Sequence, residues 1–296
     1  MIVTKKALNL TVLSGRGISQ TEAAPMLSDA GFDGCFWVAE EGVSLRPVAQ
    51  KVRQTGLTLD FIHAPVAQVD KLWVEGEEGQ RRLELLIHWM RQCAENQVPL
   101  MISHVWTQFA PVEPNQLGLD RFGTLLELAQ REGVRIAFEN AEIDKFLLYI
   151  REHLFSHPAV GFCFDSGHEL CYNGGRDQLA LFGEKLLCTH LNDNLGQTGP
   201  AIDCRDDAHM LPFDGRVDWE HTARRLSAAR PLDTLTFELK MQNQPGRHTH
   251  DRYAPLSPEE ILSLSYRKAL RFEALMVRRK KADFHDFHQN PIKISK

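Results

Sequence analysis

Short apolar runs alternate with longer amphipathic stretches along the whole chain. Most of the eight apolar runs are rich in Val, Ile, Leu and Phe, which is typical of strands buried on both faces of a parallel sheet. The predicted strands are Ala7–Leu13, Asp33–Val38, Leu57–His63, Val98–Trp106, Val134–Glu139, Ala159–Asp165, Leu186–Asp193 and Thr234–Glu238. Eight strands, each followed by a helix-length stretch, predict an α/β fold built as a single (β/α)₈ barrel, the TIM barrel.

Helix signals lie in the stretches between these strands. Ser19 and Glu22 form a capping-box pattern at the start of a predicted helix that ends at Ala30. Further predicted helices are Glu77–Asn96, Leu117–Arg131 and Ser257–Lys281. A doubly wound open sheet also alternates strands and helices, but no glycine-rich phosphate loop follows the first strand. The pattern therefore favours the barrel.

The chain shows no internal repeat and no linker of biased composition. We therefore expect one catalytic barrel domain over residues 1–277 and a basic C-terminal tail over residues 278–296. The 296 residues suit a single barrel, and 43% apolar with 25% charged residues is typical of a globular protein with a substantial core. The tail is expected to be frayed and solvated, with docking of a partner subunit as the alternative.

Charge and composition argue against some classes of function, although they do not exclude nucleic acid, because a basic patch can lie within an acidic total. The chain has 34 Lys and Arg against 39 Asp and Glu, which gives a net charge of -5. This charge does not indicate a protein that binds a polyanion. The N-terminus lacks a signal-peptide pattern and no apolar run approaches a membrane span, which predicts a cytoplasmic location and no membrane partner. Six cysteines without zinc-ribbon spacing are expected to be buried free thiols.

Acidic residues and histidines fall where the predicted strands end, and a barrel carries its chemistry at that end. The last six strands, or the loops after them, supply His63, His104, Glu139, Asp165, His168, His190, Asp207, His209 and Glu238. Glu139, Asp165 and Glu238 follow apolar runs, and these carboxylates would repel one another unless a cation lay between them. With His190 they form an oxygen and nitrogen ligand set that suits Mn²⁺, Mg²⁺, Co²⁺ or Zn²⁺.

Five motifs resemble those of the xylose isomerase-like barrel superfamily, which includes sugar and sugar-phosphate isomerases and epimerases and the endonuclease IV type of abasic-site nucleases. They are F-E-N at 138–140, F-D-S-G-H at 164–168, H-L-N-D-N at 190–194, D-A-H-x-x-P-x-D-G-x-x-D-W at 207–219 and F-E-L at 237–239. The resemblance covers nearly the whole chain. It implies that Glu139, Asp165, His190 and Glu238 hold one divalent metal, and that His168 contacts the oxygens of a carbohydrate substrate.

The resemblance also implies that Glu139 and Glu238 are the catalytic residues that transfer the proton. Removing a proton next to a carbonyl needs a base within reach and a cation on the oxygen that becomes negative. Glutamates on the fifth and eighth strands would approach the sugar from different sides. Transfer on opposite faces epimerises the carbon, whereas transfer on one face gives aldose–ketose isomerisation.

The nuclease branch is the alternative. It holds three zinc ions with nine ligands, and the resemblance matches all nine here, adding His63, His104, His168, Asp207 and His209 as further candidate metal ligands. Such a site suits phosphodiester hydrolysis. The segment 64–67 after His63 has no aromatic wedge, and the loops after the first three strands carry few basic residues. These features favour a carbohydrate over a nucleic acid, and a barrel that binds metal and ligand without turnover is a third class.

Further substrate contacts are expected from His63, His104, Trp106, Asn140 and Arg247. His63 and His104, each taken alone, are more typical of hydrogen-bonded loop residues. Trp106 lies near a strand end, where its ring can stack on a sugar or pack in the core. Asn140 can bind hydroxyls or orient ligands, and Arg247 lies in a polar loop that can bind a phosphate or carboxylate. Members of the family often pair, so a homo-oligomer is also expected, with the C-terminal helix as its candidate interface.

Overall fold

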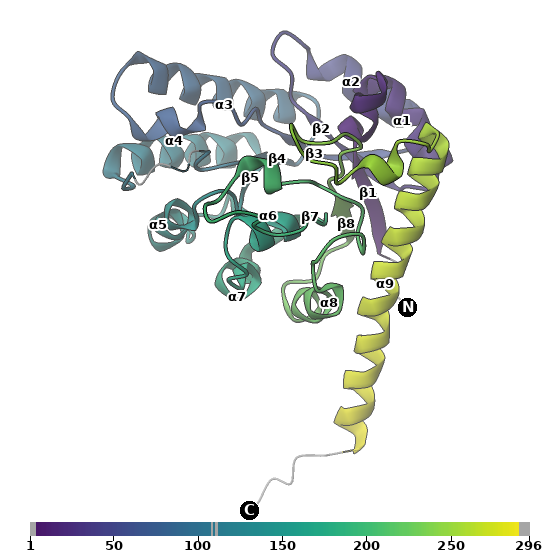
Figure 1. Ribbon diagram of the computed structural model, residues 1–296. Coiled ribbons are helices and arrows are strands. Elements are labelled where there is room, and N and C mark those ends of the chain that lie inside the picture. Colours follow the sequence, from purple (N-terminus) through teal and green to yellow (C-terminus); the bar gives the residue numbers. More distant parts are fainter. Residues whose placement is uncertain (1–3, 108, 110–111, 290–296) are drawn as a thin grey trace, which may run out of the picture.

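The computed structural model describes residues 4–107, 109 and 112–289, and for residues 278–289 it describes the backbone alone. Eight parallel strands form one sheet in the order β7-β6-β5-β4-β3-β2-β1-β8. They are β1 (Lys5–Asn9), β2 (Gly34–Val38), β3 (Thr58–His63), β4 (Leu100–Ser103), β5 (Arg135–Glu139), β6 (Val160–Asp165), β7 (Leu186–His190) and β8 (Thr234–Phe237). Figure 1 shows these strands at the centre, with the helices around them.

Backbone hydrogen bonds join the two end strands, β7 and β8, and so close the sheet into a barrel. The Leu191 N–H donates to the Thr236 carbonyl at 2.9 Å, and the Glu238 N–H donates to the Leu191 carbonyl at 3.3 Å. The Thr189 hydroxyl donates to the same Thr236 carbonyl at 3.0 Å. The predicted (β/α)₈ barrel is therefore confirmed.

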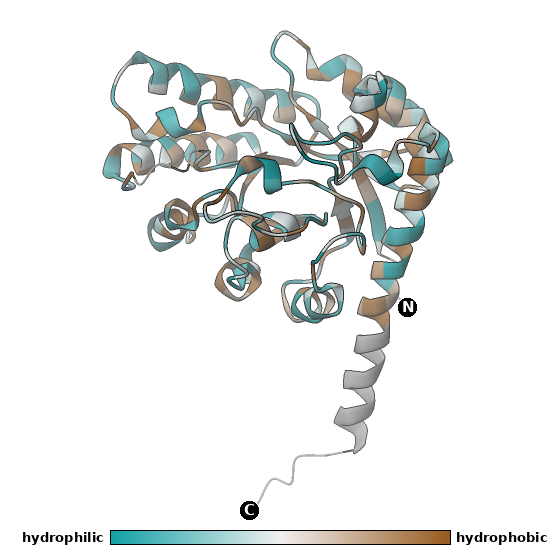
Figure 2. Cartoon of the chain, viewed as in Figure 1, coloured by the Kyte–Doolittle hydropathy of each residue, from teal (hydrophilic) through white to brown (hydrophobic). Residues whose placement is uncertain are grey.

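Helices form the outer layer, and their apolar faces turn toward the strands (Figure 2). They are α1 (Gln20–Asp29), α2 (Leu45–Gln54), α3 (Glu77–Glu95), α4 (Gln116–Glu132), α5 (Asp144–Leu154), α6 (Ser166–Cys171), α7 (Gln178–Phe182), α8 (Trp219–Ala228) and α9 (Pro258–Gln289). The capping box of α1 is confirmed, because Ser19 and Glu22 each accept a hydrogen bond from the backbone N–H of the other. Among the described residues, no helix is both long and apolar enough to cross a bilayer.

Several elements have other bounds than those predicted, and β7, for example, ends at His190 and not at Asp193. β1 ends at Asn9 because a 3-10 helix, η1 (Leu10–Arg16), follows it and buries the apolar residues that had extended the predicted strand. β4 is shorter than its apolar run. Helix α9 continues to Gln289, past the predicted end at Lys281, and no Gly or Pro interrupts residues 259–290. The backbone of the tail, expected to be frayed, is thus helical to Gln289, and residues 290–296 lie outside the described part.

The inside of the barrel is filled by apolar side chains that also support the site above them. This group comprises Phe36, Phe61, Leu100, Ile102, Ala137, Cys163 and Cys188. The Phe36 ring stacks on Phe61 with 4.7 Å between centroids and on the His190 imidazole with 5.0 Å. Packing of this density restricts the His190 ring to one orientation.

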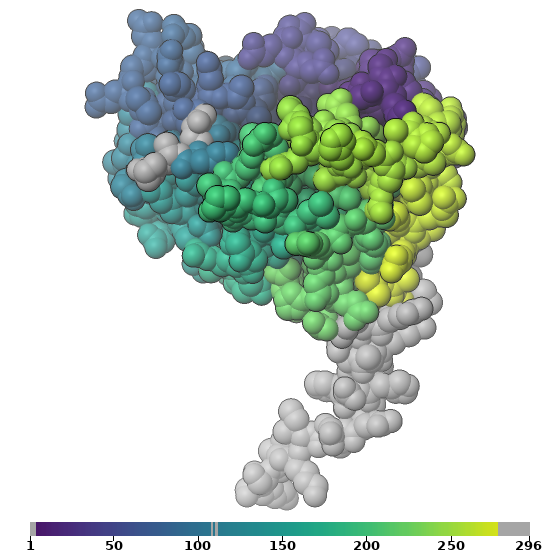
Figure 3. Space-filling model, viewed as in Figure 1, coloured from purple at the N-terminus to yellow at the C-terminus, as the bar shows by residue number. Residues whose placement is uncertain are grey.

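The two ends of the barrel domain meet on its outer surface. Helix α9 packs beside α1, where the Phe32 and Tyr266 rings meet edge to face with 5.3 Å between centroids. Figure 3 shows the yellow C-terminal part of the barrel domain beside its purple N-terminal part. This contact joins the final helix to the start of the barrel.

Candidate metal centre and active site

The predicted ligands lie at one end of the barrel, where the strands finish. His63, Glu139, Asp165 and His190 are the last residues of β3, β5, β6 and β7. His104 and Glu238 immediately follow β4 and β8, His168 is in α6, and Asp207 and His209 are in the connection from β7 to α8. All nine residues are predominantly buried and lie at the C-terminal mouth of the barrel.

Four of these residues, the predicted metal ligands, form a group that could hold a metal ion. Glu139, Asp165, His190 and Glu238 each offer a ligand atom, and these atoms lie within 4.8 Å of one another. The His190 Nδ1 atom is 3.0 Å from the Glu139 Oε1 atom and 3.2 Å from the Glu238 Oε2 atom. Donor atoms this close around one point fit a single divalent ion with oxygen and nitrogen ligands.

Two further groups surround this set. His63, Glu139 and His190 form one of them, and His168, Asp207 and His209 form the other. The His63 and His104 Nε2 atoms lie 3.1 and 3.3 Å from the Glu139 Oε2 atom. The site therefore has more potential ligands than one ion requires.

Backbone carbonyls orient three of the histidines. The Nδ1–H groups of His63, His168 and His209 donate to the carbonyls of Ala64, Asn140 and Glu238, at 2.8, 2.9 and 3.2 Å. A carbonyl can only accept, so Nδ1 carries a proton, and Nε2 is the nitrogen that can give up its proton and ligate a cation. Each Nε2 faces a carboxylate of the site, as it should in a histidine that ligates a metal.

In the four-residue site, the carboxylates and the histidines shift one another's pKa values. Burial would lower the pKa of His190, but Glu139 and Glu238 raise it to about 10. Burial would likewise raise the pKa of Glu139, yet the His190 and His104 imidazoles hold it well below its usual range. Burial raises the pKa of Asp165 to about 6. Histidine protons thus balance the carboxylates, and a divalent cation bound here would displace those protons.

A hydrogen-bond frame fixes the Asp165 carboxylate. Its Oδ1 atom accepts from the His168 backbone N–H at 2.7 Å and so caps α6. Its Oδ2 atom accepts from the Asn192 amide at 2.8 Å. Asn140 accepts from the Asp165 N–H and donates to the Asp165 carbonyl, so both amides hold this ligand in place. Partners of this kind set the direction of a ligand's lone pairs.

The long motif after β7 shapes the loop that carries Asp207 and His209. Asp193 accepts from the Trp219 indole N–H at 2.9 Å and from the Val217 backbone N–H at 2.9 Å. Asp193 and Met210 pair through two backbone hydrogen bonds, which place His209 beside the mouth. His209 itself has a left-handed φ of 49°, which is uncommon for a residue with a side chain.

A cavity of about 470 Å³, lined by both polar and apolar residues, opens over these ligands. Side chains that line it include His63, His104, His168, Asp207, His209 and Glu238. The remaining wall includes Thr11, Ser14, Glu142, Tyr172, Cys204, Lys240, Gln242 and Gln244. A concave site with many hydroxyl, amide and charged groups suits a small hydroxylated ligand.

Three of the predicted substrate contacts are placed elsewhere. Trp106 is buried and stacks on Phe146 with 4.0 Å between ring centroids. The Arg247 guanidinium is 2.8 Å from Asp206 and 3.4 Å from Asp203. Neither residue lines the described part of the cavity, and the Asn140 amide is used within the protein. This geometry favours a packing role for Trp106. It favours a structural role in the loop for Arg247, and the positioning of Asp165 for Asn140.

Residues 25–259 match the xylose isomerase-like TIM barrel family. The chain belongs to this family. The uncharacterized protein y4fM of Sinorhizobium fredii is 28% identical over 292 residues, which cover 85% of this chain and 88% of that protein. Among solved structures, an L-ribulose 3-epimerase is 16% identical with a TM-score of 0.71 and covers 98% of this chain and 100% of its own.

The IolI protein with a bound zinc atom is a further structural neighbour of this family member. It is 16% identical with a TM-score of 0.70, and the match covers 90% of this chain and 97% of IolI. Identities this low show a shared fold. The reaction must be argued from the side chains at the mouth.

Several residues at the mouth of this xylose isomerase-like barrel were missed in the sequence. Glu142 lies 3.8 Å from His104, and Lys240 lies 3.8 Å from Asp207. Cys204 is exposed and lines the cavity, so the expectation of buried thiols is confirmed for five cysteines and wrong for this one. The signal for Lys240 was its spacing, since residues 238, 240, 242 and 244 alternate along the chain and all face the cavity.

Proposed function

We propose that this protein is a divalent-metal-dependent isomerase or epimerase that transfers a proton next to the carbonyl of a carbohydrate. One observation carries the proposal, the convergence of Glu139, Asp165, His190 and Glu238 on a single point at the end of β5 to β8. A divalent ion held there would supply positive charge to the oxygen on which negative charge develops. The metal is proposed to be Mn²⁺, Mg²⁺, Co²⁺ or Zn²⁺.

Glu238 is the better placed of the two proposed proton carriers. Its carboxylate lines the cavity, and its side chain is 13% exposed. Glu139 is fully buried, and its carboxylate lies within 3.3 Å of nitrogen atoms of four histidines, His63, His104, His168 and His190. Glu238 is therefore proposed as the base that reaches the substrate first, and Glu139 as the carrier on the other side, which also holds the metal.

Histidines supply the proposed contacts to substrate hydroxyls. His63, His104 and His168 all line the cavity. The Nδ1–H of His63 and of His168 is engaged by a backbone carbonyl, so each directs its Nε2 toward the mouth. A sugar hydroxyl can donate to such a nitrogen. These contacts orient the carbon that loses its proton relative to Glu238.

An anionic group on the substrate would find one cation in this cavity, whose wall also holds Glu142, Asp207 and Glu238. Lys240 is the one Lys or Arg among the described residues that line it, and its Nζ is 3.8 Å from the Asp207 Oδ2 atom. Arg247, the predicted anion contact, is paired with Asp203 and Asp206 instead. We therefore propose that Lys240 binds a carboxylate or phosphate carried by the sugar.

A second candidate function, phosphodiester hydrolysis at abasic sites in DNA, is favoured by one observation. His168, Asp207 and His209 form a ligand group separate from the central four residues. Together with His63 and His104 they provide for three ions, which suit phosphodiester hydrolysis. A single cation in the cavity wall argues against a polyanionic substrate.

Metal content tests the two functions against each other. The protein is purified without chelator or metal-affinity resin and analysed by elemental mass spectrometry, then assayed on neutral, phosphorylated and carboxylated sugars and on abasic DNA. About one ion per chain with sugar turnover supports the isomerase or epimerase. About three zinc ions with DNA cleavage supports the second function. A chain that takes up no metal after reconstitution contradicts both.

A further inference from the structure

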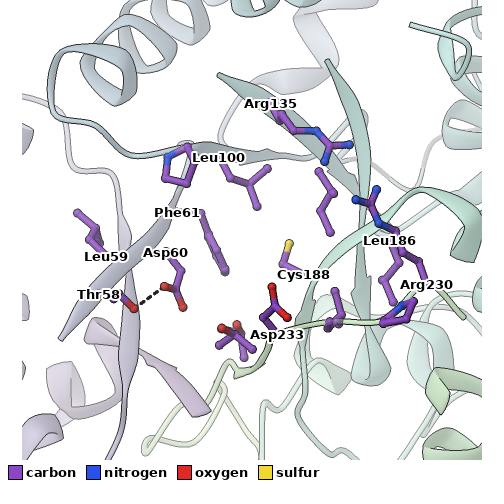
Figure 4. Close-up of a pocket in the computed structure, with 16 residues that line it drawn as sticks. Thr58, Leu59, Asp60, Phe61, Leu100, Arg135, Leu186, Cys188, Arg230 and Asp233 are labelled. Atoms are coloured by element: carbon purple, nitrogen blue, oxygen red, sulfur yellow. Dashed lines mark hydrogen bonds between the residues drawn. The ribbon is translucent and has the colours of Figure 1, made fainter. Parts of the chain in front are cut away.

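A second hollow of about 470 Å³ lies at the opposite end of the barrel. Its lining includes Thr58, Leu100, Arg135, Leu186 and Thr234, which are the first residues of β3, β4, β5, β7 and β8. The candidate metal centre lies where the same strands finish. The apolar residues inside the barrel separate the two ends, so this hollow is a distinct compartment (Figure 4).

Two arginines on one side of this hollow have no carboxylate partner among the described residues. Arg135 donates through Nη2 to the Val160 carbonyl at 3.2 Å, and its buried Nε atom has no hydrogen-bond partner. Arg230, at the end of the connection from α8 to β8, makes no ion pair within the described chain. Figure 4 shows both guanidinium groups on the same side of the hollow.

The arginines repel each other. Burial lowers the pKa of Arg135, and the positive charge of Arg230 lowers it further. Two like charges held together in this way gain most from an anion placed between them. Guanidinium groups bind carboxylate and phosphate through paired hydrogen bonds, which suits them to such an anion.

The other side of the hollow offers an acceptor. The Asp60 Oδ1 atom accepts from the Thr58 hydroxyl at 2.6 Å, whereas the buried Oδ2 atom has no hydrogen-bond partner. Gly34 on β2 makes room for this carboxyl, because a Cβ at that position would lie 2.7 Å from Oδ2. Between the two sides the floor is apolar, with Phe61 and Cys188 among its residues. Figure 4 shows Asp60 across the hollow from the arginines.

We propose that this hollow binds a small organic anion, with its carboxylate or phosphate between Arg135 and Arg230 and a hydroxyl donated to Asp60. The two cations are too few for a nucleic acid, and the acidic side chains of Asp60 and Asp233 in the same lining repel a polyanion. The volume is enough for a ligand of a few carbon atoms. This site is independent of the reaction proposed for the opposite end.

Equilibrium binding of defined anions tests the proposal. Inorganic phosphate, glycerol phosphate and lactate are titrated by calorimetry into the full-length, metal-loaded protein, with glycerol as the neutral control. We expect saturable binding of at least one hydroxylated anion. Arg230→Met should weaken it at least about tenfold, the Arg135→Met/Arg230→Met pair should abolish it, and Arg46→Met, which replaces an exposed arginine elsewhere, should leave it unchanged.

A variant of the metal centre separates this site from the active site. Binding that survives in Glu139→Gln but disappears with the arginine pair supports the proposal. Equal affinity in the wild type and Arg230→Met, or loss of binding in Glu139→Gln alone, overturns it, as does no saturable binding of any probe below about 10 mM. Because Arg230 is exposed, its single variant should keep the fold. Soaking crystals with selenate gives a second measurement, and an anomalous peak only outside the hollow overturns the proposal.

Discussion

The Nδ1 atom of His190 lies 3.0 Å from the Oε1 atom of Glu139, although β6 separates the strands β7 and β5 that these two residues end. Both side chains are fully buried, and the same histidine nitrogen lies 3.2 Å from Glu238. A buried carboxylate requires a partner of opposite charge, whether a protonated imidazole or a metal ion. Any substitution that disturbs this pair should therefore affect both the metal affinity and the turnover.

Glu139→Gln tests the pair directly. Glutamine keeps the shape of the side chain but loses the negative charge, so the four-ligand site should bind its metal more weakly. Turnover should fall by about 100-fold or more, the range that one proton-transferring group contributes. The measurements are kcat/KM and metal content on the same samples. The matched control is Glu152→Gln in α5, an exposed glutamate that should change neither quantity, and unchanged turnover in Glu139→Gln would refute the assignment.

Gly167→Ala tests the frame around Asp165. A Cβ at residue 167 would collide with the Asn192 side-chain oxygen, and Asn192 holds the Asp165 carboxylate at 2.8 Å. Displacing this amide should lower metal affinity by about 10- to 100-fold, as expected for partners that orient a ligand. Titration with a competing chelator measures the affinity.

Gly123→Ala is the control for the frame. Residue 123 lies in α4, and a Cβ there would meet Leu154 only at 4.0 Å. It should stabilise the helix by about 0.5 to 1 kcal/mol and leave metal affinity unchanged. Equal metal affinity in Gly167→Ala and the wild type would show that Asn192 does not position Asp165.

The sequence was sufficient to predict the barrel and the position of the candidate ligands at the strand ends, because both depend on local pattern. A buried strand is an apolar run, and a Glu or Asp directly after it, such as Glu139 or Asp165, marks the strand's C-terminal end. Parallel strands in a barrel bring these ends together, so the convergence follows from the fold. The capping box at Ser19 is equally local and was equally predictable.

Loop contacts could not be predicted in this way. Arg247 and Asp206 are 41 residues apart, and only the folded connections bring them to 2.8 Å. Lys240 was not identified because the predicted strand stopped at Glu238, although the alternation that places Glu238 at the cavity continues to Lys240. The hollow with Arg135 and Arg230 was not predicted because the chemistry of a barrel is expected at the C-terminal ends of its strands, whereas these residues lie at or near the N-terminal ends.

Lys240→Met tests whether the substrate carries an anionic group. Methionine keeps most of the length of the lysine side chain but removes the charge. The KM for phosphorylated or carboxylated sugars should rise at least about tenfold, equivalent to about 1.4 kcal/mol, while the KM for neutral sugars stays the same. Lys240→Arg should retain most of the preference, and Lys51→Met, at an exposed position of α2, should have no effect. An equal loss for neutral and anionic sugars would instead assign Lys240 to the Asp207 contact alone.

Asp60→Asn tests the electrostatics of the hollow at the other end of the barrel. Burial raises the pKa of Asp60 to about 6 in the folded protein, against about 3.9 in an unfolded chain. Between these two pKa values the native state binds more protons than the unfolded state does. Ionisation of Asp60 therefore lowers the free energy of unfolding as pH rises, and its full effect is present above pH 6. Asparagine does not ionise.

The stabilising effect of Asp60→Asn relative to the wild type should therefore grow between pH 3.5 and pH 8, by up to about 3 kcal/mol. Urea unfolding of both proteins at the two pH values measures this difference. At each pH the variant and the wild type carry the same other charged groups, so the difference in their free energy of unfolding reports on residue 60. Asp29→Asn, at the exposed end of α1, provides the control and should show little change with pH. A difference between Asp60→Asn and the wild type that is the same at both pH values would mean that the Asp60 carboxyl titrates as it does in water, and that the hollow is open enough to solvate it.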